Sequence, residues 1–441
     1  MPLLDRSLDP IEHEVERRVS DALSGEEASA DANSGWQRAF DMALELARSA
    51  PALAGHSGVT LMKLARNVAN DLYLLGPLED LLADPEVSEI MVNGPHDVRV
   101  EVGGRIGRTD YRFRDDDHVM RIIQRICDAD NRRCDNTNPM CNCTLHGDRA
   151  RGGGSRVNTV AKPISVDHNL IEIRKFADHK LGYEELIGLG TMDGRVRDFL
   201  DAIVRARMNI VIMGGTGSGK TTLLNAMSSS IPDDQRVIVD EDTTELTLQG
   251  DHVIRMETRQ PNIEGVGGVT MRDLIINNLR QRPDRIVVGE CRGGEAFDML
   301  QAMGTGHDGS LTTVHANDAR SCISRLQMMV QMSEAGAQLP QSAIMQVICS
   351  AVDFIVCVNR FPDGSRKVTE VTELQGTQDD GHGRAVATLA PIIRFTIDGY
   401  DASGHVRGGF APTGEHMTAE HSSRFAINGV TIEDGWFRAW E

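Results

Sequence analysis

The second half of the chain alternates short apolar runs with amphipathic stretches. The apolar runs predict buried strands at 210–213, 237–239, 253–256, 285–288, 310–314 and 354–358. Between several of them, apolar residues three and four positions apart predict helices at 221–230, 271–279, 295–303 and 319–332. Strands that alternate with helices are typical of a parallel sheet covered by helices, so an α/β domain is expected here.

The first part of the chain has a different pattern. Helix-like spacing covers 11–23, 36–53 and 59–75, and a polar stretch at 24–35 is typical of a flexible linker. After residue 76 the elements become shorter, and they predict a smaller α+β domain with strands at 90–92, 98–102 and 170–176, a helix at 118–129 and a cysteine-containing loop after it. The expected domains are a helical, partly flexible extension (1–70), the α+β domain (71–177), the α/β domain (178–374) and a divergent C-terminal extension (375–441).

The net charge and the apolar runs of the chain argue against some classes of function. The formal net charge of -19 argues against a dedicated nucleic-acid binder, which would normally carry a basic surface. No stretch approaches the twenty apolar residues of a membrane span, and the N-terminus lacks a secretory signal. A cytoplasmic protein is expected.

Eight cysteines suit a reducing compartment, and one group of them allows two interpretations. Cys134, Cys141, Cys143 and His146 are a candidate zinc site, or three of them are ordinary reduced thiols. Structural zinc sites usually use pairs spaced C-x₂₋₄-C, so the spacing favours the thiols.

Residues 210–222 form the most informative motif, an apolar strand followed by Gly-Gly-Thr-Gly-Ser-Gly-Lys-Thr-Thr. This is the Walker A phosphate loop, G-x-x-x-x-G-K-[ST], between a strand and a helix. Glycines let backbone N–H groups converge on a phosphate, the helix N-terminus adds positive potential, and the lysine adds a mobile charge. The residues expected to bind ATP are Gly214, Gly215, Thr216, Gly217, Ser218, Gly219, Lys220, Thr221 and Thr222.

Acidic and titratable residues follow three of the other predicted strands. Glu241 follows the run at 237–239, Glu290 the run at 285–288, and His315 the run at 310–314. Chemistry collects at the carboxyl ends of parallel strands, so we expect Glu290 and the Thr221 hydroxyl to hold Mg²⁺, directly or through water, and Glu241 to activate the attacking water. The alternative for the neighbouring acids Asp242 and Glu245 is helix capping or surface solvation. The negative charge that develops on the γ-phosphate in the transition state is often stabilised by arginine. The candidates are Arg255, Arg259, Arg272, Arg280, Arg282 and Arg285.

Four motifs in this order carry a family resemblance. They are the phosphate loop at 214–222, an acidic segment with Glu241-Asp242 and Glu245-Leu246, the segment 279–292, and the segment 305–317 with two histidines. Together they resemble the type II/type IV secretion ATPases, most of all the CpaF/TadA-like branch that assembles tight-adherence (Tad) pili. Segments 76–82, 89–94, 154–157 and 173–176 resemble that branch's N-terminal domain, whereas the loop at 146–154 and the tail beyond 374 depart from it.

The resemblance implies a RecA-like P-loop domain in a ring of six chains that couples ATP hydrolysis to an inner-membrane platform protein, at the inner face of the cell membrane. It places Glu241 in the family's acidic box, Glu290 in the Walker-B box, and His307 and His315 in the histidine box. It implies that Arg259, Arg272 and Arg280 reach phosphate, some across a subunit interface, and that Arg174 lies where the N-terminal domain closes over the nucleotide.

Two alternative functions stay open. One is a conjugative, DNA-translocating ATPase, which the acidic charge disfavours, and the other is a nucleotide-gated scaffold with little turnover. A GTPase switch would need an Asn-Lys-x-Asp motif, which the sequence lacks.

Overall fold

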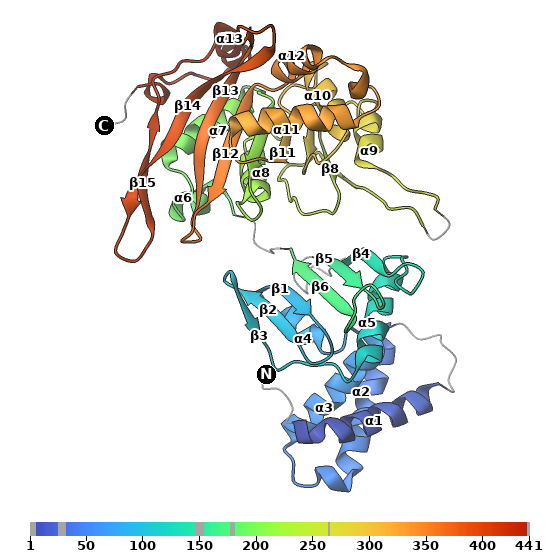
Figure 1. The fold of residues 1–441 in the computed structure, drawn as a ribbon. Coiled ribbons are helices and arrows are strands. Elements are labelled where there is room, and N and C mark those ends of the chain that lie inside the picture. Colours follow the sequence, from blue (N-terminus) through green and yellow to red (C-terminus); the bar gives the residue numbers. More distant parts are fainter. Residues whose placement is uncertain (1–5, 25–31, 146–153, 177–180, 263–264, 439–441) are drawn as a thin grey trace. The chain divides into compact units, whose positions relative to one another are not determined.

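The chain folds into two compact units, Met1–Asp178 and His179–Glu441, in a computed structural model (Figure 1). The structure describes all residues except 1–5, 25–31, 146–153, 177–180, 263–264 and 439–441. The candidate zinc ligand His146 therefore lies outside the described residues.

Three helices begin the first unit: α1 (Asp9–Leu23), α2 (Ala32–Ser49) and α3 (Gly58–Tyr73). They pack together through apolar residues that are fully buried, among them Val19, Ala43 and Leu64. Their spacing of three and four residues is what the sequence predicts, but α2 begins inside the expected linker. Short 3₁₀ turns flank them at Arg6–Leu8 and Pro51–Leu53.

A six-stranded antiparallel sheet forms the rest of the first unit. Its order is β3 (Arg105–Arg108), β2 (Val98–Val102), β1 (Val87–Val92), β6 (Leu170–Lys175), β5 (Ser155–Val160) and β4 (Met140–Leu145). Helix α5 (Asp116–Ala129) buries Val119, Ile122, Ile123 and Ile126 in the same core as the sheet, and α4 (Leu78–Ala83) joins them. The expected cysteine-containing loop is partly wrong, because residues 140–145 form β4, in which Cys141 and Cys143 face inward and Asn142 faces solvent.

A nine-stranded sheet organises the second unit, in the order β15-β14-β13-β12-β7-β11-β10-β8-β9. The strands from β12 to β9 run parallel, as the sequence predicts: β12 (Phe354–Arg360), β7 (Ile210–Gly214), β11 (Leu311–His315), β10 (Arg285–Val288), β8 (Val237–Glu241) and β9 (Val253–Glu257). The α/β fold class is confirmed.

Helices cover both faces of this sheet. Along β7, Ile210 and Ile212 join one core with α6 (Tyr183–Gly188), α7 (Gly194–Arg205) and α8 (Lys220–Ser228). Val211 and Met213 join the other core, with α9 (Met271–Asn278), α10 (Glu295–Gly304), α11 (Ala319–Met332) and α12 (Gln341–Ala351). Burial on both faces explains why these strands are continuous apolar runs.

The expectation of a separate extension from residue 375 is wrong. Strand β13 (Arg366–Asp379) runs through that boundary, and β14 (Ala385–Tyr400) and β15 (Val406–Pro412) extend the same sheet with antiparallel pairing. Helix α13 (Ala419–Ile427) is held by the buried His421, whose Nε2 lies 3.0 Å from Asp353 Oδ1. The last 3₁₀ turn (Asp434–Trp436) places Trp436 edge-on to Phe199, with ring centroids 5.3 Å apart. The extension therefore completes the core of the second unit.

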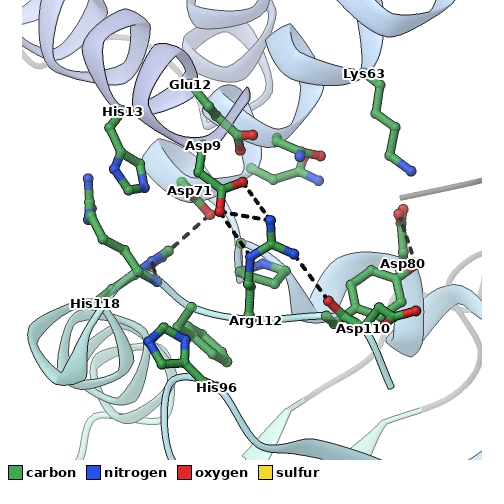
Figure 2. A pocket seen from close by; sticks show the side chains of 17 residues that line it. Asp9, Glu12, His13, Lys63, Asp71, Asp80, His96, Asp110, Arg112 and His118 are labelled. Atoms are coloured by element: carbon green, nitrogen blue, oxygen red, sulfur yellow. Dashed lines mark hydrogen bonds and ion pairs between the residues drawn. The ribbon is translucent and has the colours of Figure 1, made fainter. Parts of the chain in front are cut away.

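Ion pairs join the N-terminal helices to the α+β part of the first unit. Arg112 pairs with Asp9 at 2.6 Å, and Arg114 pairs with Glu16 at 2.7 Å. A polar pocket of about 150 Å³ lies beside these ion pairs, and it is lined by Glu12 and His13 of α1 and Asp71 of α3 (Figure 2). Burial, and then the nearby charge of Asp71, raise the pKa of Glu12 to about 8. Glu12 is therefore protonated in the folded chain at neutral pH.

Replacing Glu12 with Gln should change how stability depends on pH. Below pH 4.5 the carboxyl is protonated in both states, whereas between pH 4.5 and about 8 only the unfolded chain releases the proton, so stability falls as pH rises. We expect Glu12→Gln to stabilise the first unit by about 1–3 kcal/mol at pH 8 and hardly at pH 4.5. Thermal unfolding at several pH values measures this, with the exposed Glu14→Gln of the same helix as control. Parallel pH profiles for wild type and Glu12→Gln would contradict the assignment.

Candidate nucleotide-binding site

The phosphate loop connects the central strand β7 to α8. All five residues of β7 are buried, and α8 begins at Lys220. Gly217 and Gly219 adopt φ angles of 68° and 94°, a region that favours glycine. A Cβ on Gly214 would overlap the carbonyl oxygen of Val358 on the neighbouring strand. The glycines are therefore required by backbone geometry and by close packing.

Lys220 lies back over its own loop. Its ammonium donates hydrogen bonds to the carbonyl oxygens of Gly214 (3.1 Å) and Gly215 (3.0 Å), and it lies 3.3 Å from Nδ1 of His315. These partners are neutral dipoles, since burial and then the charge of Lys220 lower the pKa of the His315 ring, against the opposing effect of Glu290. An anionic phosphate is a stronger partner for an ammonium than a carbonyl oxygen. The Lys220 ammonium is therefore placed to exchange these contacts for an anionic phosphate.

Glu290 lies beside this lysine–histidine pair. It follows β10, which is the neighbour of β11, and its Oε1 lies 2.8 Å from Nε2 of His315. Its other oxygen accepts two hydrogen bonds from Arg292, at 2.6 and 2.9 Å. The His315 ring therefore lies between the Lys220 ammonium and Glu290, whose buried Oε1 has no hydrogen-bond partner among the described residues. The structure therefore brings Lys220, His315 and Glu290 together, and it adds Arg292, which the sequence analysis did not single out.

Glu241 has a different environment. The residue ends β8 and is buried, and its carboxylate accepts hydrogen bonds from the backbone N–H groups of Glu245 and Leu246, each at 3.0 Å. It therefore holds the turn that follows β8. Its neighbour Asp240 is fully buried next to Asn278, and burial raises the pKa of Asp240 to about 7.

The predicted arginines are dispersed over the second unit. Arg259 follows the edge strand β9 and donates to the carbonyl of Gly267 at 2.6 Å, and Arg272 of α9 pairs with Asp298 at 3.0 Å. Arg280 follows α9 and precedes Gln281 in the sequence. The carbonyl oxygen of Gln281 accepts a hydrogen bond from Arg236, which lies just before the start of β8. Arg280 thus lies towards the amino ends of the parallel strands, at the edge opposite the phosphate loop.

His307 lies at the far end of β11 from the phosphate loop, and Arg174 belongs to the first unit. His307 precedes β11, with Nδ1 3.3 Å from the carbonyl oxygen of Ala302, whereas His315 ends that strand. The two histidines therefore lie at opposite ends of one strand. Arg174 belongs to β6 of the first unit, where Nε lies 3.6 Å from Glu89.

Two arginines that the sequence did not indicate, Arg360 and Arg366, flank the phosphate loop. Arg366 of β13 donates from Nε to the carbonyl oxygen of Gly217 at 2.9 Å, and its Cδ lies 3.3 Å from where a Cβ on Gly219 would be. Arg360 is its cross-strand partner on β12, the neighbour of β7. No local motif marks these residues, because only the pairing of β12 with β7 brings them to the loop.

Much of the sequence matches known proteins. Residues 72–386 match the family described as type II/IV secretion system protein. The chain belongs to this family. A putative conjugal transfer protein of Mycobacterium tuberculosis (strain CDC 1551 / Oshkosh) is 34% identical over 321 residues, which cover 73% of this chain and 90% of that protein.

A second sequence relative agrees with the family assignment, and a solved structure has a similar fold. The type IV secretion system protein VirB11 of Bartonella quintana (strain Toulouse) is 30% identical over 338 residues, covering 69% of this chain and 93% of VirB11. The X-ray structure of the Legionella pneumophila ATPase DotB shows a similar fold, with a TM-score of 0.50 and 21% identity over 69% of this chain and 80% of that one. Among the residues that the structure describes, no helix has both the length and the apolar character needed to cross a membrane.

The Arg366 contact leads to a test of nucleotide binding. We expect Arg366→Ala to weaken binding of an ATP analogue about tenfold, because one charged donor beside the loop is worth about 1.5 kcal/mol. A titration with a fluorescent nucleotide measures the Kd. The matched control is Arg384→Ala, an exposed arginine of the β13–β14 turn that pairs with Asp380. Equal Kd values for the two variants would contradict a role for Arg366 at the loop.

Proposed function

We propose that this chain is an ATP-hydrolysing motor that works as a ring of six chains, and that it powers a Tad-type pilus or a type II/IV secretion machine through an inner-membrane platform protein. The observation that carries the proposal is the convergence of Lys220, His315 and Glu290 at the phosphate loop of a family member. A fold that only presented a glycine loop would not need a histidine and an acid on two adjacent strands around its lysine.

The residues divide the chemistry between them. Lys220 exchanges its loop carbonyls for the β- and γ-phosphate oxygens of ATP, while the backbone N–H groups of 214–219 and the start of α8 bind the remaining negative charge. The Thr221 hydroxyl in the first turn of α8 and the Glu290 carboxylate suit Mg²⁺, which prefers oxygen ligands and neutralises phosphate charge when it is bound. His315, between Lys220 and Glu290, links the state of the loop to the acid.

The general base has two candidates. Among the residues that the structure describes, no backbone N–H group donates to Glu290, and its carboxylate contacts the side chains of His315 and Arg292. Glu241 would have to release the N–H groups of Glu245 and Leu246 before it could hold a water. We therefore propose that Glu290 orients the attacking water as well as Mg²⁺, and that Glu241 shapes the site through its turn.

A neighbouring chain completes the site in this proposal. Arg280 lies at the edge of the sheet opposite its own phosphate loop, which suits a residue that acts on another chain's nucleotide. Arginine supplied from a neighbour stabilises the charge that develops during phosphoryl transfer.

A conjugative DNA-translocating ATPase is the second candidate, because the mycobacterial relative is described as a putative conjugal transfer protein. The net charge of -19 disfavours direct contact with DNA. Tight binding of duplex DNA that weakens steeply with added salt would favour this candidate over the pilus motor.

Glu290→Gln tests the proposed chemistry. We expect ATP turnover of the assembled chain to fall about 100-fold or more, because the amide cannot accept a proton from water, while the Kd for ATP stays within about threefold. Glu334→Gln, an exposed acid after α11, is the control and should keep full turnover. Lys220→Ala should instead lose binding. An assembled wild type that hydrolyses no ATP would exclude the motor and leave the nucleotide-gated scaffold.

A further inference from the structure

Four cysteines gather at one end of the sheet in the first unit. Cys127 lies in the last turn of α5, Cys134 in the segment that follows, and Cys141 and Cys143 on β4. All four side chains are buried, with exposures between 0% and 6%. Because side chains alternate along a strand, Cys141 and Cys143 point to the same side, towards α5. Sequence spacing alone omits Cys127, which the fold brings in from the helix.

The sulfur atoms have the spacing of ligands around a single ion. Sγ of Cys143 lies 3.4 Å from Sγ of Cys141 and 3.5 Å from Sγ of Cys127, and all three sulfurs lie within 4.8 Å of one another. Zinc–sulfur bonds of about 2.3 Å in a tetrahedron put ligand sulfurs about 3.8 Å apart. An iron–sulfur cluster places several atoms between its cysteines and would spread the sulfurs further.

Cys134 supplies a fourth sulfur. Its thiol interacts with Cys127 in the same buried core, and its Sγ lies 3.7 Å from the carbonyl oxygen of Pro139, just before β4. Thiols this close to one another can bind one metal ion as thiolates, because metal binding releases their protons.

The surroundings suit a negatively charged centre. Four thiolates around a divalent ion carry a net charge of about −2, and Arg132 beside Cys141 offsets part of it. Arg132 is held by Asp130, at 2.9 Å, and Asp130 also accepts the backbone N–H of Thr144 on β4. These contacts fix the guanidinium next to the sulfurs.

We propose that one zinc ion is bound by the four buried thiolates of the first unit, Cys127, Cys134, Cys141 and Cys143. Strand β4 ends the order of the sheet, and among the described strands it pairs with β5 alone (Figure 1). A zinc ion ties this strand to the end of α5 and to the intervening segment, so it stabilises the edge of the first unit. It is a structural site, because four protein ligands leave no open position for a substrate.

Metal analysis of the full chain is the direct test. After removal of any affinity tag, the chain should contain one zinc per molecule, and cobalt added to the metal-free protein should give the absorption of a tetrahedral cobalt–thiolate centre. Cys143→Ser should bind zinc at least about 100-fold more weakly, beyond the roughly 10–100-fold typical of an outer-shell change. Cys349→Ser, a partly buried thiol of α12, is the control and should keep full zinc content.

Stability gives a second measurement that does not depend on a variant. Chelation of wild-type protein should lower the unfolding midpoint of the first unit by about 5 °C or more and leave the second unit unchanged. Three results would overturn the proposal: no cobalt–thiolate absorption from the wild type, equal zinc affinity in wild type and Cys143→Ser, or a disulfide between two of the four cysteines in protein isolated without oxidant. Each would assign the cysteines to core packing or redox chemistry instead.

Discussion

The parallel pairing of β7 with β11 on one side and β12 on the other determines the candidate site. In that register Gly214 lies opposite His315, so the phosphate loop and the histidine end at the same edge of the sheet. The next strand, β10, delivers Glu290 to the same edge, and β12 with β13 brings Arg366 to the loop from the other side. A register shift of one residue would turn His315 to the other face and separate it from Lys220.

Much of this could be predicted from the sequence, because local signals were sufficient. The 3.6-residue spacing over 319–332 matches α11, and the apolar runs match the six parallel strands. The phosphate loop is a contiguous motif. Glu290 and His315 were predictable because the carboxyl ends of parallel strands meet at one edge.

Other features depend on non-local contacts. Arg360 and Arg366 lie about 140 residues beyond the loop that they flank, and no spacing rule connects them to it. The sequence predicts Glu241 as the base because it does not reveal that the backbone N–H groups of Glu245 and Leu246 donate to this carboxylate. The resemblance places His307 and His315 in one histidine box, and in the fold an extended strand separates them. The half-buried strands of 366–412 alternate weakly, which explains why that region looked like a divergent tail.

The proposed ring requires that each nucleotide site takes an arginine from the next chain, because Arg280 lies at the opposite edge of the sheet from its own loop. Mixing two inactive variants tests this directly: Lys220→Ala lacks the loop lysine, and Arg280→Ala lacks the donated arginine. If the arginine acts across the interface, an equimolar mixture should recover about a quarter of wild-type ATP turnover, because random assembly into a ring pairs an intact loop with an intact arginine at that frequency. Turnover no higher than the sum of the separate variants, or full activity of Arg280→Ala alone, would contradict the account.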